Sequence, residues 1–517
     1  MISPTMITDL LAGHAAATPD RPFAVTEDGI HGYAAIHEAA LRTAGRLAAE
    51  GIRAGDHVAL AAGNSAAYLA AWFGIMAAGA VAVTINPALI GDGLAYVLRQ
   101  SDARLLIADN LFLDGPFAGL GEAAPDLPIM RIRDEGAFLA EAAGWPLPTT
   151  GAERPASAPA TILYTSGTTG APKGVVNSHA AYLAAGHHTA AMVGLTPADR
   201  CMVVLPLFHA NPQMYAVMSA LHVGSALILR DKFSAGRFFE DAARFEATGF
   251  TFVGTVLAIL AARHTNPRRD HALRFCLGGG APPSVWRDVE ERFGVKVHEL
   301  YGMTEIGGWV TANTLTHTRH GSCGQPRPDM EVRVVDADDR ILGPDEAGEI
   351  VVRPREPDVI LSGYYRQPDK LAEACRNLWF HTGDLGRFDA DGYLWFQGRS
   401  KELIRRAGEM IAPAEIETRL LKLPGVLDCA AVAVADPILG EEIKVAVVRA
   451  EHAHLQAGTV RAYLSAHLPA FMLPRYVEFL DTLPKTETEK LQRHKLIYLN
   501  DEVEDLLDPR RTGNRDD

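Results

Sequence analysis

Residues 162–174 read ILYTSGTTGAPKG, an apolar strand followed by a loop of glycines and hydroxyl residues that ends near a lysine. Glycines let backbone N–H groups turn toward an anion, the hydroxyls add donors, and Lys173 adds a mobile positive charge. The loop differs from a Walker A loop, because the GxxxxGK[ST] pattern is absent and Gly174 follows the lysine. Loops of this composition are often only turns, so phosphate binding is at this point a hypothesis.

Short apolar runs on both sides of this segment predict a layered α/β fold. Up to about residue 360, β-rich runs alternate with Ala-rich helical stretches; the runs include 57–64, 105–110, 201–207, 225–230, 250–256 and 274–280. Short strands separated by helices indicate parallel sheets, in which ligands gather at the carboxyl ends of the strands. Alternating patterns between about 321 and 395 predict antiparallel hairpins, and the pattern beyond Arg399 predicts a small α+β module.

The composition excludes several classes of protein. The 517 residues are 48% hydrophobic and 22% charged, which excludes a disordered, collagenous or coiled-coil chain. The formal charge of −14 gives no overall attraction for polyphosphates, so we expect no nucleic acid and no membrane among the partners. The five cysteines are scattered without CxxC spacing, which predicts neither a disulfide framework nor a zinc site.

The N-terminus and the most apolar segment favour a cytoplasmic protein. The first residues lack the basic region of a secretory signal, and Asp9 interrupts their apolar stretch. The uncharged run 66–85 is long enough to span a membrane, but it breaks at Gly79 into a helix-like half and the β-branched half VAVTI. We therefore predict a buried helix, a turn and a buried parallel strand in this run.

Several motifs, in the same order along the chain, resemble those of the adenylate-forming superfamily, which includes acyl-CoA synthetases, peptide-synthetase adenylation domains and firefly-type luciferases. They are YTSGTTGAPKG (164–174), PLFH (206–209), GGGAP (278–282), YGMTE (301–305), HTGDLG (381–386), GRSKELIRRAGEMIAPAEIE (398–417) and PKTETEK (484–490). The resemblance covers nearly the whole chain. Among the members of this superfamily, the sequence most resembles free-standing acyl-CoA ligases of the carnitine/crotonobetaine and medium-chain types.

The resemblance implies a two-step acid–CoA ligase with a mobile C-terminal domain. A small-molecule carboxylic acid attacks the α-phosphate of ATP, which gives acyl-AMP and pyrophosphate, and the thiol of coenzyme A then displaces AMP. Mg²⁺ accompanies ATP, and the protein contributes positioning and charge neutralisation. The implied domains are an α/β core with a β-barrel-like portion at 1–398, a hinge at 399–401, a mobile α+β domain at 402–500 and a loose charged tail at 501–517.

The resemblance also assigns residues to each part of ATP. The residues implied to bind the β- and γ-phosphates are Lys173 and the loop residues Thr165, Ser166, Gly167, Thr168 and Thr169. Thr304 is placed to bond the α-phosphate, and Glu305 is the carboxylate that faces Mg²⁺. The adenine slot is formed by Gly279, Gly280, Ala281 and Tyr301. The ribose contacts are Asp384 and Arg399.

The C-terminal segment is expected to supply a cation to the first step. Lys490 resembles the lysine that reaches the α-phosphate and the substrate carboxylate during adenylation. The preceding residue is Glu489, where relatives usually have Gly, which restricts the backbone and adds a negative charge. Lys401 is the expected hinge residue, and Gly408 lies in the segment that would line the pantetheine path after domain rotation.

The implied acyl pocket is apolar and partly formed by small residues. Its members are Phe208, His209, Val253, Gly254, Gly278, Met303, Gly307, Gly308 and Trp309. No charged residue is available there for a charged tail, so the pocket suits an uncharged acyl or aryl carboxylate. His209 is either a gate or a hydrogen-bonded core histidine. The adjacent His187 and His188 point in different directions on a helix, which favours a structural role over a metal pair.

Two alternatives to the ligase stay open. In one, the acyl group passes to a separate carrier protein, an amine or another nucleophile instead of coenzyme A. In the other, the chain is a nucleotide-binding pseudoenzyme, which is disfavoured because the ATP-facing residues named above are all present. The sequence is compatible with a monomer or a homodimer.

Overall fold

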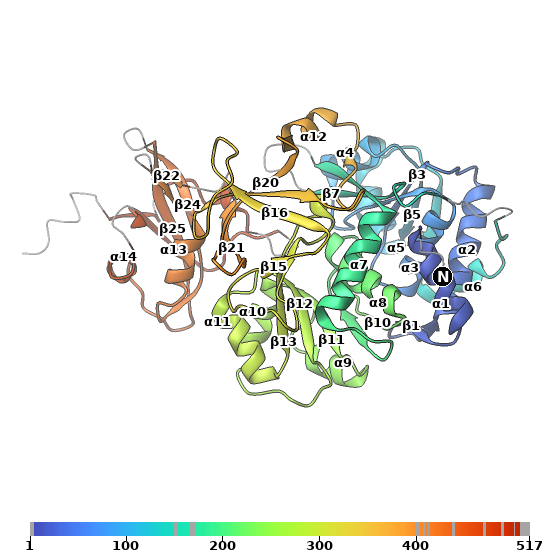
Figure 1. Ribbon diagram of the computed structural model, residues 1–517, viewed down its shortest axis with the longest axis horizontal. Helices are drawn as coiled ribbons and strands as arrows, with labels where there is room; N and C mark the ends of the chain where they lie inside the picture. Colours follow the sequence, from blue (N-terminus) through green and yellow to red (C-terminus); the bar gives the residue numbers. More distant parts are fainter. Residues whose placement is uncertain are drawn as a thin grey trace, which may run out of the picture. The chain divides into compact units, whose positions relative to one another are not determined.

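The chain divides into two compact units (Figure 1). The computed structural model describes residues 5–148, 154–165, 172–399, 404–406, 409–411, 413–436, 440–468, 472–486, 491–500 and 502–506. The first unit comprises Met1–Arg333, Val351–His381 and Ala390–Leu394, and the second comprises Val334–Ile350, Thr382–Asp389 and Trp395–Asp517.

One sheet of the first unit contains both strands that flank the loop rich in glycine and hydroxyl residues. Its strand order is β18-β8-β7-β4-β3-β5-β6, and β7 and β8 form an antiparallel hairpin, whereas β6, β5, β3, β4 and β7 run parallel. The strands are β3 (His57–Ala61), β4 (Val81–Thr84), β5 (Ala103–Asp109), β6 (Ile129–Ile132), β7 (Pro159–Thr165), β8 (Lys173–Ser178) and β18 (Gly363–Tyr364).

A second sheet of this unit has the order β15-β14-β13-β12-β11-β9-β10-β1-β2. Its strands are β1 (Pro22–Val25), β2 (Ile30–Gly32), β9 (Arg200–Val203), β10 (Ala226–Leu229), β11 (Gly249–Val253), β12 (Phe275–Gly279), β13 (Lys296–Tyr301), β14 (Thr311–Ala312) and β15 (Gln325–Pro326). Parallel pairing of β11, β12 and β13 places Val253 beside Gly279 and Gly278 beside Glu299. The segments that follow these three strands therefore start at one edge of the sheet.

Helices cover these sheets. They are α1 (Ile7–Ala17), α2 (Tyr33–Ala49), α3 (Ala66–Ala77), α4 (Gly91–Gln100), α5 (Asn110–Phe112), α6 (Glu135–Ala142), α7 (His179–Val193), α8 (Met218–Val223), α9 (Phe238–Arg244), α10 (Gly254–Arg263), α11 (Pro283–Asp288) and α12 (Pro368–Ala374). Figure 1 shows α1, α2 and α3 side by side, and α7 beside α8.

The apolar run 66–85 folds as the sequence predicts. Residues 66–76 of α3 are all buried, as expected for a helix that is apolar on every face. The chain then turns at Gly79, whose φ is +72°, into the fully buried parallel strand β4. Within the described residues, no helix combines the length and the hydropathy needed to cross a bilayer.

The remaining strands form two further sheets. The first has the order β16-β17-β20-β19, with β21 paired to β20. It consists of β16 (Met330–Val335), β17 (Gly348–Pro354), β19 (Cys375–Arg376), β20 (Trp379–Phe388) and β21 (Leu394–Arg399). The second, with the order β23-β22-β25-β26-β27, lies in the second unit, where β24 also pairs with β25.

The second unit has the predicted α+β pattern. Its strands and helices are β22 (Ile404–Arg406), β23 (Glu409–Ile411), α13 (Pro413–Leu420), β24 (Val426–Asp436), β25 (Gly440–Arg449), α14 (Ala457–Ser465), β26 (Tyr476–Leu480) and β27 (Glu504–Asp505). Side chains from both helices and from the sheet share one core; Ile416, Ile443 and Val460 are fully buried in it.

Close packing of α7 on α8 gives a stability prediction. A methyl group on Gly186, inside α7, would lie 2.6 Å from the carbonyl oxygen of Met218 at the start of α8. We expect Gly186→Ala to lower the free energy of unfolding by about 1–3 kcal/mol, measured by denaturant titration, because the backbone must shift. In the matched control Gly13→Ala, inside α1, the methyl group meets nothing within 4 Å, so the better helix propensity should raise stability by up to about 1 kcal/mol. A Gly186→Ala chain as stable as the control would contradict this packing.

Candidate functional site

Four side chains from three separate segments meet at the end of the β7–β8 hairpin. Thr165 and Lys173 are opposite each other in this hairpin. The Thr165 hydroxyl donates a hydrogen bond to Oε1 of Glu305 at 3.4 Å, and the Tyr364 hydroxyl donates to the same oxygen at 3.3 Å. The Lys173 ammonium lies 4.8 Å from the centroid of the Tyr364 ring. A carboxylate, an ammonium and two hydroxyls thus form one cluster, which we call the Glu305 cluster.

Glu305 is buried in a short 3₁₀ helix, η5 (Thr304–Ile306), with 6% of its surface exposed. Its backbone is fixed, because the Leu361 N–H donates to the Glu305 carbonyl at 2.9 Å. Burial raises the pKa of Glu305 above its ordinary value, and the Tyr364 hydrogen bond and the Lys173 charge oppose that rise. A buried carboxylate beside an ammonium and hydroxyl groups is suited to a site that receives a cation and phosphate oxygens together.

Several predicted site residues lie outside the described residues. They are Ser166, Gly167, Thr168 and Thr169 of the loop, the hinge residue Lys401, Gly408 and Lys490. The described part of the loop region thus contributes Thr165 and Lys173, which flank the predicted phosphate loop on either side.

Three of the predicted adenine residues, Gly279, Gly280 and Ala281, lie at the end of β12 and in the tight turn after it. Gly280 has a φ of +91°, in the left-handed region that favours glycine. Gly254 begins α10 after the neighbouring strand β11, and a Cβ there would overlap the carbonyl oxygen of Gly280. Tyr301 is buried at the end of β13. The structure therefore brings Gly279, Gly280, Ala281 and Tyr301 to the same edge of the sheet.

Glu299 is a residue of this edge that the sequence analysis missed. Its carboxylate accepts hydrogen bonds from the Gly280 N–H at 2.6 Å and from the Ala281 N–H at 3.1 Å, and it is 6% exposed. Glu299 thus holds the turn in place. The signal was present in the sequence, because an acidic residue is unusual in a buried parallel strand and Glu299 lies two residues before the YGMTE motif.

The predicted acyl-pocket residues include a turn that two side chains hold. Gly307 and Gly308 have φ values of +69° and +87°, and a Cβ on Gly307 would overlap the carbonyl oxygen of Val359. Arg327 donates to the Gly307 carbonyl at 3.2 Å, and the Tyr215 hydroxyl donates to the Gly308 carbonyl at 2.9 Å.

The neighbouring pocket residues are largely apolar and buried. The Trp309 indole N–H donates to the Thr189 hydroxyl at 2.9 Å, which fixes the ring. The His209 ring centroid lies 4.0 Å from that of Phe208, and burial lowers the pKa of His209 to about 4, so this imidazole is neutral at physiological pH.

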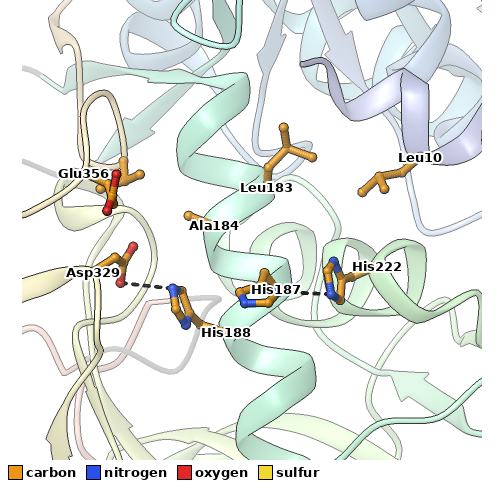
Figure 2. A pocket seen from close by; sticks show the side chains of 9 residues that line it. Leu10, Leu183, Ala184, His187, His188, His222, Asp329 and Glu356 are labelled. Carbon is orange, nitrogen blue, oxygen red and sulfur yellow. Dashed lines mark hydrogen bonds and ion pairs between the residues drawn. The ribbon is translucent and has the colours of Figure 1, made fainter. Parts of the chain in front are cut away.

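The adjacent histidines of α7 make separate contacts at a surface cavity of about 270 Å³ (Figure 2). His187 Nδ1 lies 3.1 Å from His222 Nε2, and His188 Nε2 lies 3.4 Å from Asp329 Oδ1. Among the residues that the structure describes, no three His, Cys, Asp or Glu side chains are grouped to hold a metal ion. Each ring therefore has its own structural partner.

The predicted ribose residues belong to the second unit. Asp384 is buried in β20, and its N–H donates to the Thr382 hydroxyl at 3.1 Å. The preceding Gly383 has a φ of +71°, and its N–H donates to Glu349 Oε1 at 3.0 Å. Arg399 ends β21, which pairs with β20.

The buried carboxyl of Glu299 predicts a pH dependence of stability. Burial raises the pKa of Glu299 from 4.5 to about 8, so between these pH values the folded chain binds a proton that the unfolded chain has released. Stability therefore falls as pH rises through this range, by up to about 1.4 kcal/mol per pH unit. In Glu299→Gln, which cannot titrate, we expect this component of the slope to vanish in denaturant titrations from pH 5 to 8.

Asp199→Asn is the matched control for that experiment. Asp199 is also buried and also accepts a backbone N–H, from Thr196, but hydrogen bonds, the first from the Thr248 hydroxyl, outweigh burial and lower its pKa. Its replacement should leave the slope between pH 5 and 8 unchanged. An unaltered slope in Glu299→Gln would contradict the raised pKa.

The sequence and the structure are similar to those of known acid–CoA ligases. The model of the AMP-binding enzyme family matches residues 11–365, and that of the AMP-binding enzyme C-terminal domain matches residues 415–490. A sulfoacetate–CoA ligase from Cupriavidus necator is 36% identical over 505 residues, which cover 94% of this chain and 96% of the relative. A crotonobetaine/carnitine–CoA ligase from Salmonella agona is 32% identical over 481 residues, which cover 90% and 92%.

A solved structure gives the same result. ATP-bound MatB from Rhodopseudomonas palustris superposes with a TM-score of 0.87 at 27% identity, with 95% of this chain and 98% of MatB covered. The predicted fold class and enzyme class are thereby confirmed, with ATP and coenzyme A as co-substrates of a small-molecule carboxylate. The chain belongs to the AMP-binding enzyme family, the adenylate-forming superfamily, and within it to the acid–CoA ligases.

Proposed function

We propose that this chain joins a carboxylate with an uncharged acyl or aryl tail to coenzyme A, with the Glu305 cluster as its phosphate site. A carboxylate oxygen attacks the α-phosphorus of ATP and pyrophosphate leaves; the thiol sulfur then attacks the acyl carbon and AMP leaves. The observation that carries the proposal is the convergence of Thr165, Lys173 and Tyr364 on the buried Glu305 carboxylate. Positioning and charge neutralisation suffice for this chemistry, so no covalent nucleophile is required.

The phosphate end of ATP would be held by Lys173, by Thr165 and by the loop residues up to Thr169, with Thr304 on the α-phosphate. Glu305 is the proposed protein ligand of Mg²⁺. Its buried carboxylate fits this ion, since Mg²⁺ commonly takes one or two carboxylate ligands and completes its shell with phosphate oxygens and water. The ion, when bound, would neutralise charge on the departing pyrophosphate.

The adenosine end would lie against backbone rather than long side chains. Gly279, Gly280 and Ala281, with Tyr301, are the proposed adenine contacts, and the carboxyl group of Glu299 keeps the turn in place. Asp384 and Arg399 are the proposed ribose contacts. A carboxylate accepts from two hydroxyls at once, which suits a vicinal diol.

The acyl pocket would be formed by the residues predicted for it. Phe208, Trp309 and Gly278 are buried, and His209 is neutral, which supports an uncharged substrate tail. The sulfoacetate–CoA ligase relative is named for an acid with a second negative group. A charged tail of that kind would have no free counter-charge among the proposed pocket residues of this chain.

The C-terminal domain, 402–500 after the hinge 399–401, would move between the two half-reactions. In the first, Lys490 would reach the α-phosphate and the substrate carboxylate. After rotation about Lys401, the segment near Gly408 would line the path of the pantetheine arm of coenzyme A.

Pyrophosphate release tests the proposal. A panel of carboxylic acids is assayed with ATP and Mg²⁺, with and without coenzyme A, and thioester products are identified by mass spectrometry. We expect at least one uncharged acid to give acid-dependent pyrophosphate release and a coenzyme A thioester. Turnover that does not depend on coenzyme A and requires a carrier protein or an amine would show that coenzyme A is not the acceptor. ATP binding without any acid-dependent release would contradict the proposed reaction.

Lys490→Ala separates the two steps. We expect adenylate formation to slow by at least about 100-fold, because the cation at the reacting phosphate is lost, while thioester formation from a supplied acyl-adenylate stays near wild type. Lys485→Ala is the control; it removes another cation of the same sequence segment, which pairs with Asp428 at 2.7 Å. Equal losses in both half-reactions would contradict the role of Lys490.

A further inference from the structure

A buried arginine lies directly behind the predicted acyl pocket. Arg327 is in the connection between β15 and β16, and its side chain has an exposed fraction of 0%. One guanidinium nitrogen donates to the Gly307 carbonyl at 3.2 Å, and the guanidinium carbon lies 5.3 Å from the Trp309 ring centroid. Because Gly307 and Trp309 are both proposed pocket residues, a positive charge is built into the support of the pocket wall.

Asp329 pairs with this guanidinium through both of its oxygens. Arg327 Nε donates to Oδ1 at 2.7 Å and Nη2 donates to Oδ2 at 3.1 Å, and Asp329 is 7% exposed. A bidentate pair of this geometry is among the stronger charge-assisted contacts in proteins. Its net charge is zero, so the wall presents no unpaired cation to a substrate.

The groups around the pair do not restore a positive charge. His188 lies 3.4 Å from Asp329 Oδ1, and burial lowers its pKa to about 4, so it is neutral at physiological pH (Figure 2). His187 is paired with His222 on the far side of the cavity, and Glu356 is an exposed acid in the cavity lining. Within this set, the two fully charged groups that are buried are Arg327 and Asp329, and their charges cancel.

We propose that Asp329 is a specificity-determining residue of this enzyme, because it cancels the charge of Arg327 and thereby selects acids without a second negative group. The inference rests on the proposed function, since it concerns the acid that the same site activates. An acid with a second carboxylate or a sulfonate would bring that charge into an apolar pocket with no free counter-charge. An acid of equal length with an uncharged tail has no such cost.

Asp329→Asn tests the inference. The substitution keeps the size and one acceptor of the side chain, and it leaves the Arg327 charge uncancelled. The readout is kcat/KM, from pyrophosphate release, for matched acids that differ by one carboxylate: butanoate and succinate, and benzoate and terephthalate. We expect the wild type to prefer the monoacid, and the diacid-to-monoacid ratio to rise at least about tenfold in the variant, since the freed guanidinium attracts the second anion.

Two further variants control for structural damage. Arg327→Met/Asp329→Asn removes both charges, so its ratio should return to within about threefold of the wild-type ratio even if both KM values rise. Asp241→Asn breaks a different partly buried pair, with Arg230 at 3.1 Å, and should leave the ratio unchanged. If Asp329→Asn does not fold, Asp329→Ser, which leaves room for water beside the guanidinium, frees the same charge.

Failure of this inference and failure of the proposed function are distinguishable. If none of the tested acids supports pyrophosphate release by the wild-type chain, the proposed function is contradicted. An active Asp329 variant with an unchanged ratio overturns only the inference. A wild-type chain that prefers the diacid overturns the inference together with the uncharged tail of the proposed substrate, but leaves the ligase reaction standing. A shift of the same size in Asp241→Asn would also overturn it, because the effect would then come from general loss of stability.

Discussion

The buried carboxylate of Glu305 is the constraint on which the site depends. A charge with so little exposed surface is costly to keep, and the chain lowers that cost with hydroxyls from two distant segments and with the nearby Lys173 ammonium. These contacts tie the β7–β8 hairpin, β18 and η5 to one another. The strand end at Thr165, from which the predicted phosphate loop continues, is therefore fixed, and in the proposed reaction ATP would meet a carboxylate that is already in place.

The chain stabilises its buried acids in different ways, and each way fits a different task. Glu299 accepts two backbone N–H groups and fixes the turn behind the proposed adenine slot. Asp329 is paired with the guanidinium of Arg327, so the pair has no net charge. Glu305 accepts long hydrogen bonds from two hydroxyls and has a more distant cation than Asp329 has, which suits it to accept a new positive partner.

The sequence predicted the architecture well because its signals are local. The run 66–85 breaks at a glycine into one helical and one β-branched half, and the hairpin around Lys173 follows from a strand, a loop and a second apolar run. The motifs likewise placed Thr165, Lys173 and Glu305 in one site. Tyr364, by contrast, reaches Glu305 from a two-residue strand far along the chain, and no periodicity or spacing reveals such a contact. Arg327 and Asp329 also escaped notice, since an exposed turn and a buried ion pair can have the same sequence.

The position of the Lys173 ammonium over the Tyr364 ring has one more consequence. An aromatic face attracts an ammonium with only about 0.5–2 kcal/mol, much less than a fully charged partner does. In the proposed reaction the Tyr364 ring would hold the Lys173 ammonium before ATP binds. A triphosphate could then displace the ring as the partner of the ammonium at a small cost in free energy. The phenol would then keep its bond to the acid, so one side chain could change partners while the rest of the cluster stayed still.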